Sequence, residues 1–148
     1  MKVRIIYAKW PKLRFQPEFH LPPHGPVVFA SALPDDVDVR FTDEHVTDVD
    51  FDDDADLIFM SVMLTCQIPR AWEIADEFRK RGKTVIFGGI AAQLHFEETM
   101  LHADSVFLGE AEGRMEGVLS DFRNGNLQKV YNFHNSFPDI SLVKTARR

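Results

Sequence analysis

The chain has 148 residues, one cysteine and 45% hydrophobic residues, which excludes intrinsic disorder and a disulfide-stabilised fold and fits one domain with its own core. Eight of the 23 acidic residues lie between Asp43 and Asp56, so the net charge of −6 is local and indicates no nucleic-acid partner. No apolar run approaches the ~20 residues of a membrane helix, and the N-terminus lacks the apolar stretch of a signal peptide. We therefore expect a cytoplasmic protein with no membrane partner.

Apolar and β-branched segments alternate with segments of helical period along the chain. Strands are predicted over residues 3–8, 37–42, 56–62, 84–87 and 105–108. Helices are predicted over residues 26–33, 68–81, 96–102 and 112–122. A long proline-rich loop follows the first strand, and residues 127–133 are a candidate for an extra edge strand.

This alternation predicts an α/β fold, a three-layer sandwich around a five-stranded, mostly parallel sheet. We expect a single domain over residues 1–133. Residues 134–148 show no clear period and are expected to form a linker or tail.

The turns that follow the strands are the candidates for a site, because ligands of open α/β sheets bind outside the carboxyl ends of the strands. Ser61, Met63 and Leu64 follow the third strand, Gly88-Gly89 the fourth, and Gly109-Glu110-Ala111-Glu112 the fifth. Glycine allows close approach of backbone to a ligand, the serine offers a hydroxyl, and the methionine and leucine offer apolar packing.

Such turns suit a large, flat, mostly apolar ligand with a long tail. The residues alone leave an alternative open, in which the glycines only form a tight turn and Ser61 only caps the next helix. We predict no catalytic residue.

Other ligand classes are disfavoured. No G-x-G-x-x-G sequence and no P-loop follows a strand. Lys9 and Ser61 stand near the places where a phospho-receiver domain needs acidic residues. Residues 48–59 have the acidic spacing of a calcium loop, but Asp53 and Phe59 replace its glycine and glutamate. We interpret the acidic segment as a solvated turn.

Four segments together resemble the N-terminal cobalamin-binding domain of radical-SAM enzymes: residues 56–62, 70–75, 85–90 and 103–112. The resemblance covers about residues 1–133. It implies a Rossmann-like sheet of order 2-1-3-4-5, with cobalamin at the carboxyl ends of the strands and its nucleotide tail reaching into the domain. The cofactor-binding residues that it implies are Ser61, Met63, Leu64, Gly88, Gly89, Gly109, Glu110 and Trp10.

The resemblance departs from the cobalt-ligating Asp-x-His-x-x-Gly motif. Asp43-Glu44-His45 follows the second strand instead of the first, and Asp48 replaces the glycine. We therefore interpret His45 as a surface histidine and predict no metal ligand. His20 and His24 lie in the loop that carries the motif in the family, but without the motif.

In relatives without this ligand, apolar side chains or water contact the lower face of cobalamin. Trp10, Leu13 and Phe15 are the candidates for that role in this chain.

The iron–sulfur motif Cys-x3-Cys-x2-Cys is missing, because Cys66 is the only cysteine; we expect it to be a buried or half-buried inert thiol. The [4Fe–4S] cluster and S-adenosylmethionine would belong to a radical-SAM catalytic domain elsewhere in the same polypeptide. We predict a module that positions a corrinoid for radical chemistry such as methyl transfer. Substitution of Gly89 by valine is expected to abolish corrinoid binding and leave the fold intact.

A second hypothesis is a degenerate flavodoxin-like module for protein interaction or substrate gating, which binds no cobalamin. A pocket filled by the domain's own side chains would favour this second hypothesis. An open groove between the Ser61 and Gly88 turns would favour the first.

Overall fold

The computed structural model describes residues 1–12, 15, 22–139, 141 and 143–146. Within these residues one sheet has the strand order β2-β1-β3-β4-β5-β6, and every neighbouring pair is parallel. The strands are β1 Lys2–Tyr7, β2 Asp38–Asp43, β3 Leu57–Ser61, β4 Thr84–Gly88, β5 Ser105–Leu108 and β6 Val130–Asn132. The α/β fold and the order 2-1-3-4-5 are confirmed, and the candidate edge strand is present as β6, beside β5.

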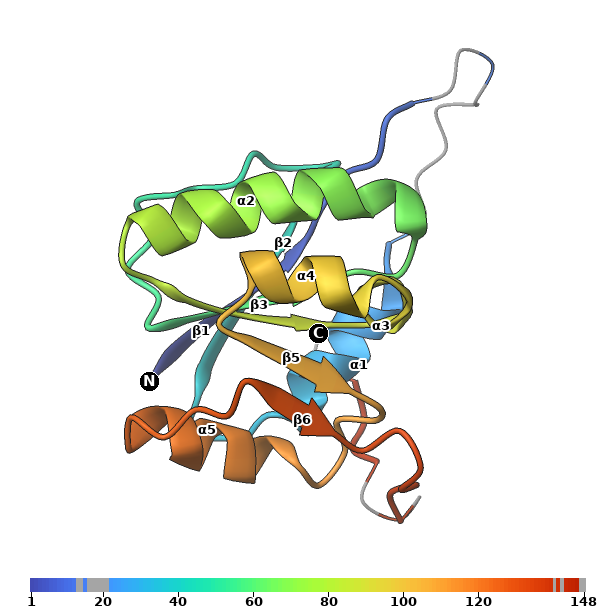
Figure 1. The fold of residues 1–148 in the computed structure, drawn as a ribbon. Helices are drawn as coiled ribbons and strands as arrows, with labels where there is room; N and C mark the ends of the chain where they lie inside the picture. Colours follow the sequence, from blue (N-terminus) through green and yellow to red (C-terminus); the bar gives the residue numbers. More distant parts are fainter. Residues whose placement is uncertain (13–14, 16–21, 140, 142, 147–148) are drawn as a thin grey trace.

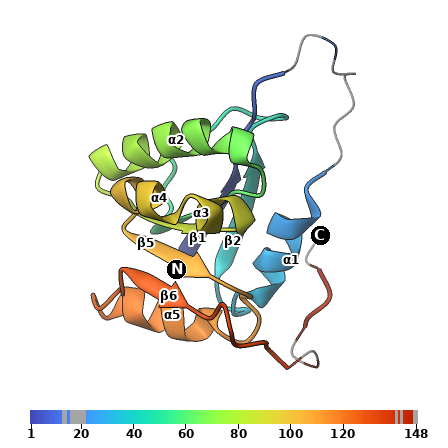
Figure 2. The same cartoon turned by 45° about the vertical axis from the view of Figure 1, so that its right-hand side comes forward.

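Helices cover both faces of the sheet and give three layers. They are α1 His24–Ala32, α2 Ile68–Lys80, α3 Ile90–Leu94, α4 Phe96–His102 and α5 Met115–Arg123, with a short 3-10 helix, η1, at Thr65–Gln67. Figure 1 shows α2 and α4 on one side of the sheet and α5 on the other, and Figure 2 shows α1 across the sheet from α2.

Two helical segments differ from the sequence-based expectation. Helix α5 begins at Met115 instead of residue 112, because Gly113 has φ +70° in the turn that precedes it. Helix α3 was not predicted, since its five residues directly after Gly89 are too short to show a helical period.

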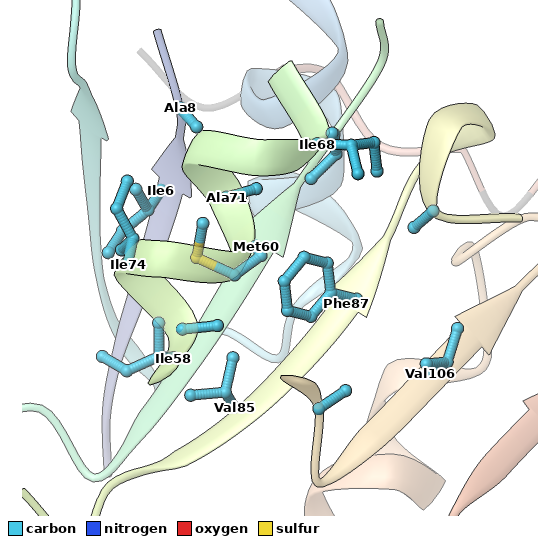
Figure 3. Packing of buried hydrophobic residues seen from close by; sticks show 14 of the residues in the cluster. Ile6, Ala8, Ile58, Met60, Ile68, Ala71, Ile74, Val85, Phe87 and Val106 are labelled. Carbon is cyan, nitrogen blue, oxygen red and sulfur yellow. The ribbon is translucent and has the colours of Figure 1, made fainter. Parts of the chain in front are cut away.

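The strands are buried on both faces, and their side chains divide between two cores. In β3, Leu57 and Phe59 pack with α1 and α5, whereas Ile58 and Met60 pack under α2. Figure 3 shows the second of these cores, where Ile74 of α2 lies among side chains of the sheet. Each such fully buried side chain contributes about 1.5–3 kcal/mol to the hydrophobic stabilisation of the fold.

The acidic segment is bound to the start of the sheet by basic side chains. Asp53 is buried, pairs with Arg4 of β1, and accepts a hydrogen bond of 2.9 Å from the backbone N–H of Ala55. Lys2 of β1 pairs with Asp54 at the surface. The interpretation of this segment as a solvated turn is therefore wrong for Asp53, whose charge is compensated in the interior.

The described residues after β6 lie against the domain. His134 Nδ1 is 2.8 Å from Gln93 Nε2 of α3, and Arg114 Nη2 donates to the carbonyl and hydroxyl oxygens of Ser136. No helix in the part of the chain that the structure describes is long and apolar enough to cross a membrane.

Candidate functional site

A cavity of about 330 Å³ lies at the carboxyl ends of β3, β4 and β5, on the sheet face that α1 covers. Strand β3 and its loop contribute Phe59, Met60, Ser61 and Met63, while the ends of β4 and β5 contribute Gly88, Gly89, Phe107 and residues 109–112. Helix α1 closes the opposite side with His24, Gly25, Val28 and Phe29.

The cavity exists because small residues end two neighbouring strands on the same face. Side chains two residues apart in a strand point to the same face of the sheet. Ser61 therefore lies on the α1 side with Phe59, and Gly88 lies on that side with Ile86. Ser61 and Gly88 are register partners in β3 and β4. A Cβ atom added at Gly88 would meet no heavy atom within 4 Å. The missing side chain of Gly88 therefore leaves open space on the cavity side of the sheet.

Gly89 has a different role from Gly88. Its φ is +98°, and an added Cβ would lie 2.4 Å from the carbonyl oxygen of Val62. Gly109 is similar, with φ +102° and an added Cβ 2.8 Å from the backbone of Phe133. At these two positions the backbone conformation and the neighbouring backbone atoms require glycine, whether or not a ligand is bound. The expectation that valine at position 89 leaves the fold intact is therefore wrong.

The loop after β3 is held by a side chain that sequence reasoning missed. Gln67 is 0% exposed, and its Oε1 accepts hydrogen bonds from the backbone N–H groups of Met63, at 3.0 Å, and Leu64, at 2.9 Å. Its Nε2 donates to the carbonyl oxygen of Ala8 at 2.6 Å. One amide thus joins the cavity loop to the end of β1. In the sequence, the only sign of this role is that Gln67, a polar residue, stands at the start of the apolar face of α2.

The structure bears on the alternative left open for Ser61. Helix α2 has Gln67 as its N-cap residue, and η1 has Leu64. Ser61 precedes both, so it does not cap the next helix, and it lines the cavity instead.

Six of the eight predicted cofactor-binding residues line this cavity: Ser61, Met63, Gly88, Gly89, Gly109 and Glu110. Leu64 and Trp10 do not line it. Leu64 is exposed in the same loop. Trp10 lies beyond the carboxyl end of β1, with its ring centroid 4.0 Å from that of His45 and 6.2 Å from that of Tyr7. Both stay predictions.

Of the side chains considered for the lower face of the cofactor, Trp10 and His45 lie together. The side chain of His45 is only 12% exposed and its Nδ1 lies 3.0 Å from Asp43 Oδ1, so its interpretation as a surface histidine is wrong. Phe15 is 91% exposed, and Leu13 and His20 lie outside the described residues. His24, by contrast, lines the cavity. Cys66 is exposed in η1, and not buried or half-buried as expected.

A buried carboxylate fixes the start of the long loop after β1. The side chain of Glu44 is 2% exposed; Arg70 of α2 donates to its Oε1 through Nε at 2.9 Å and Nη2 at 2.6 Å, and the backbone N–H of Lys9 donates to its Oε2 at 3.0 Å. Burial raises the pKa of Glu44, but the hydrogen bonds from Arg70 and Lys9 outweigh burial and hold the pKa below its ordinary value.

Comparisons with known proteins give one family and two relatives of this chain. The family model of the B12 binding domain matches residues 13–119. The chain is 37% identical over 117 residues to bacteriochlorophyllide d C-8(2)-methyltransferase of Chlorobaculum tepidum, covering 78% of this chain and 26% of that protein. It is 29% identical over 107 residues to bacteriochlorophyllide d C-12(1)-methyltransferase of the same organism, covering 72% of this chain and 24% of that protein. The chain thus spans about a quarter of the length of these relatives. No solved structure gives a significant match.

Proposed function

Since the chain belongs to the B12 binding domain family, we propose that the cavity at the ends of β3, β4 and β5 binds cobalamin with the nucleotide tail of the cofactor inside. The observation that carries the proposal is the open space beside Ser61 and Gly88, which the side chains of the described residues leave unfilled. A degenerate module that binds no cofactor is expected to have filled this space, so the cavity favours cobalamin binding over that alternative.

The residues of the cavity suit the tail of a corrinoid. At about 330 Å³, the cavity is at the small end of the ~300–1,000 Å³ range of small-molecule sites, so it takes the tail while the larger corrin ring stays outside. Phe29, Phe59 and Phe107 supply apolar walls, and Ser61 supplies a hydroxyl. We assign the exposed Leu64 and the partly exposed Trp10 to the outer part of the site, as predicted contacts of the ring.

We further propose that the module serves a methyltransferase of the radical-SAM type. Two longer relatives, each matched over about a quarter of its length, are methyltransferases by name. When bound, cobalamin supplies the cobalt–carbon chemistry of methyl transfer. This chain's residues bind and orient the cofactor and keep water from its tail, while a [4Fe–4S] cluster and S-adenosylmethionine are assigned to a catalytic domain in the rest of the polypeptide.

Titration of the purified chain with hydroxocobalamin and methylcobalamin, followed by the visible spectrum and by corrinoid retained after desalting, tests the binding proposal. Gly88→Val is the informative variant, because valine suits a strand and its Cβ would meet no heavy atom within 4 Å. It is expected to melt like the parent and to lose corrinoid.

Gly117→Ala is the matched control. It adds a methyl group in α5, where a Cβ also meets no heavy atom within 4 Å, and it is expected to retain corrinoid. A parent chain that binds neither cobalamin at high concentration would refute the proposal, as would a stable Gly88→Val variant that binds like the parent.

A further inference from the structure

We propose that the cavity selects the lower base of the corrinoid, accepting an apolar bicyclic base such as 5,6-dimethylbenzimidazole and disfavouring a purine such as adenine. This inference rests on the proposed function, because it requires the nucleotide tail to enter the cavity. It goes further by naming the class of corrinoid that the domain binds.

The inner wall of the cavity is aromatic. Phe59 of β3 and Phe107 of β5 are 3% and 5% exposed, so they mark the deep end, and Phe29 of α1 meets Phe59 edge to face with ring centroids 4.9 Å apart. Val28 adds a branched apolar side chain from the same helix. A flat ring placed against these residues gains apolar burial and edge-to-face contacts with them.

Polar side chains lie mostly at the mouth. Among the described residues four polar side chains line the cavity; His24 and Glu110 are exposed and Glu112 is half-exposed, each on a helix end or a loop. Ser61 is the polar side chain that the sheet itself contributes, beside Gly88. Its hydroxyl can donate one hydrogen bond and accept others.

The two classes of base differ in the polar groups that they would bury. In the nucleotide tail, dimethylbenzimidazole has one unsubstituted ring nitrogen, which a single hydroxyl can satisfy. Adenine has three such nitrogens and an amino group, and Ser61 alone cannot pair with all of them. Buried polar groups without partners are costly, so we expect the adenine form to bind about tenfold or more weakly than cobalamin.

The test compares three corrinoids on the same chain: cobalamin, the adeninyl cobamide, and cobinamide, which has no nucleotide base. Dissociation constants are measured by titration in the visible range. We expect cobalamin to bind most tightly and the other two at least about tenfold more weakly.

The outcomes separate this inference from the function on which it rests. Equal affinity for cobalamin and the adeninyl cobamide, with weak binding of cobinamide, would overturn the selectivity and leave the cobalamin site standing. Cobinamide bound as tightly as cobalamin would overturn the placement of the tail, and with it the inference. Failure of all three to bind would refute the proposed function itself.

A pair of isosteric variants tests whether the cavity wall is the cause. Val28→Thr adds one hydroxyl to the wall, and Val27→Thr makes the same change on α1 at a residue that does not line the cavity. Val28→Thr is expected to raise the affinity for the adeninyl cobamide relative to cobalamin several-fold, and Val27→Thr to leave the ratio unchanged. A ratio that does not move in Val28→Thr, or that moves equally in both variants, would overturn the assignment.

Discussion

Replacement of Gln67 by methionine tests the link between the cavity loop and β1. Methionine has a similar length and is apolar, so it fills the buried space of Gln67 and removes only the hydrogen bonds. Three backbone groups then lose their partner: the carbonyl of Ala8 and the N–H groups of Met63 and Leu64.

The magnitude follows from the burial of these groups. Ala8 is fully buried, so its unpaired carbonyl costs about 1–3 kcal/mol. Met63 and Leu64 are partly exposed, and water can replace much of their lost bonding, at about 0.5 kcal/mol each. The free energy of unfolding is expected to fall by about 2–4 kcal/mol, which a domain with ~5–15 kcal/mol of stability survives with its fold intact.

Urea unfolding measures this loss, and corrinoid titration well below the melting temperature measures its effect on the site. We expect the affinity for cobalamin to fall by more than the unfolded fraction explains, because the loop that carries Met63 is released. The exposed Gln128 provides the control, Gln128→Met, which is expected to change neither quantity. A Gln67→Met variant with the stability and affinity of the parent would refute the positioning role of Gln67.

Gln67→Glu adds a signature in pH that a purely steric effect lacks. The ionised carboxylate can accept from Met63 and Leu64 but cannot donate to Ala8, whereas the protonated form can do both. The folded state therefore favours the protonated carboxyl, whose pKa rises on folding. The stability of Gln67→Glu relative to the parent is expected to be highest in acid and to fall as pH rises through the folded-state pKa of the new carboxyl. A pH-independent difference between variant and parent would contradict this reasoning.

Two further predictions concern the buried ion pair and the second glycine. Arg70→Met is expected to cost about 1–3 kcal/mol, because the buried Glu44 carboxylate loses its main partner and keeps only Lys9. Folding lowers the pKa of Glu44, so this difference in stability should be full above the ordinary carboxyl pKa and shrink as pH falls through the folded-state pKa. Chemical denaturation across pH measures it. Gly89→Ala is expected to lower the melting temperature clearly, through its positive φ and its contact with the Val62 carbonyl, whereas Gly88→Ala should melt within a few degrees of the parent; equal melting of the two variants would count against their different roles.

The sheet was predictable from sequence because its strands are short apolar runs with helices of clear period between them. The segment at residues 56–62 has the composition of a strand covered on both faces, and β3 is buried along Leu57–Met60. The position of the cavity was predictable for the same reason, since parallel strands bring their carboxyl ends to one edge. Ser61, Gly88 and Gly109 were therefore found from their places at strand ends.

Contacts across the fold were beyond sequence reasoning. Phe29 and Val28 enter the cavity from a helix that follows the long loop after β1, and only packing of α1 on the sheet brings them there. Gln67 donates a hydrogen bond to the carbonyl of Ala8, 59 residues away in the sequence. Gly88 and Gly89 are identical neighbours in sequence, and their different roles depend on backbone angles and on the Val62 carbonyl.

The small residues at the ends of β3 and β4 leave a gap on the α1 side of the sheet, where a row of side chains would otherwise pack. A base held there would complete that row, so that cofactor occupancy and folding become a single coupled equilibrium. Saturation at a hundred times the dissociation constant would then add about 2.7 kcal/mol to the free energy of unfolding. In a cell short of corrinoid, the cofactor-free domain would be the more readily unfolded and proteolysed form, and the amount of protein would follow the supply of its ligand.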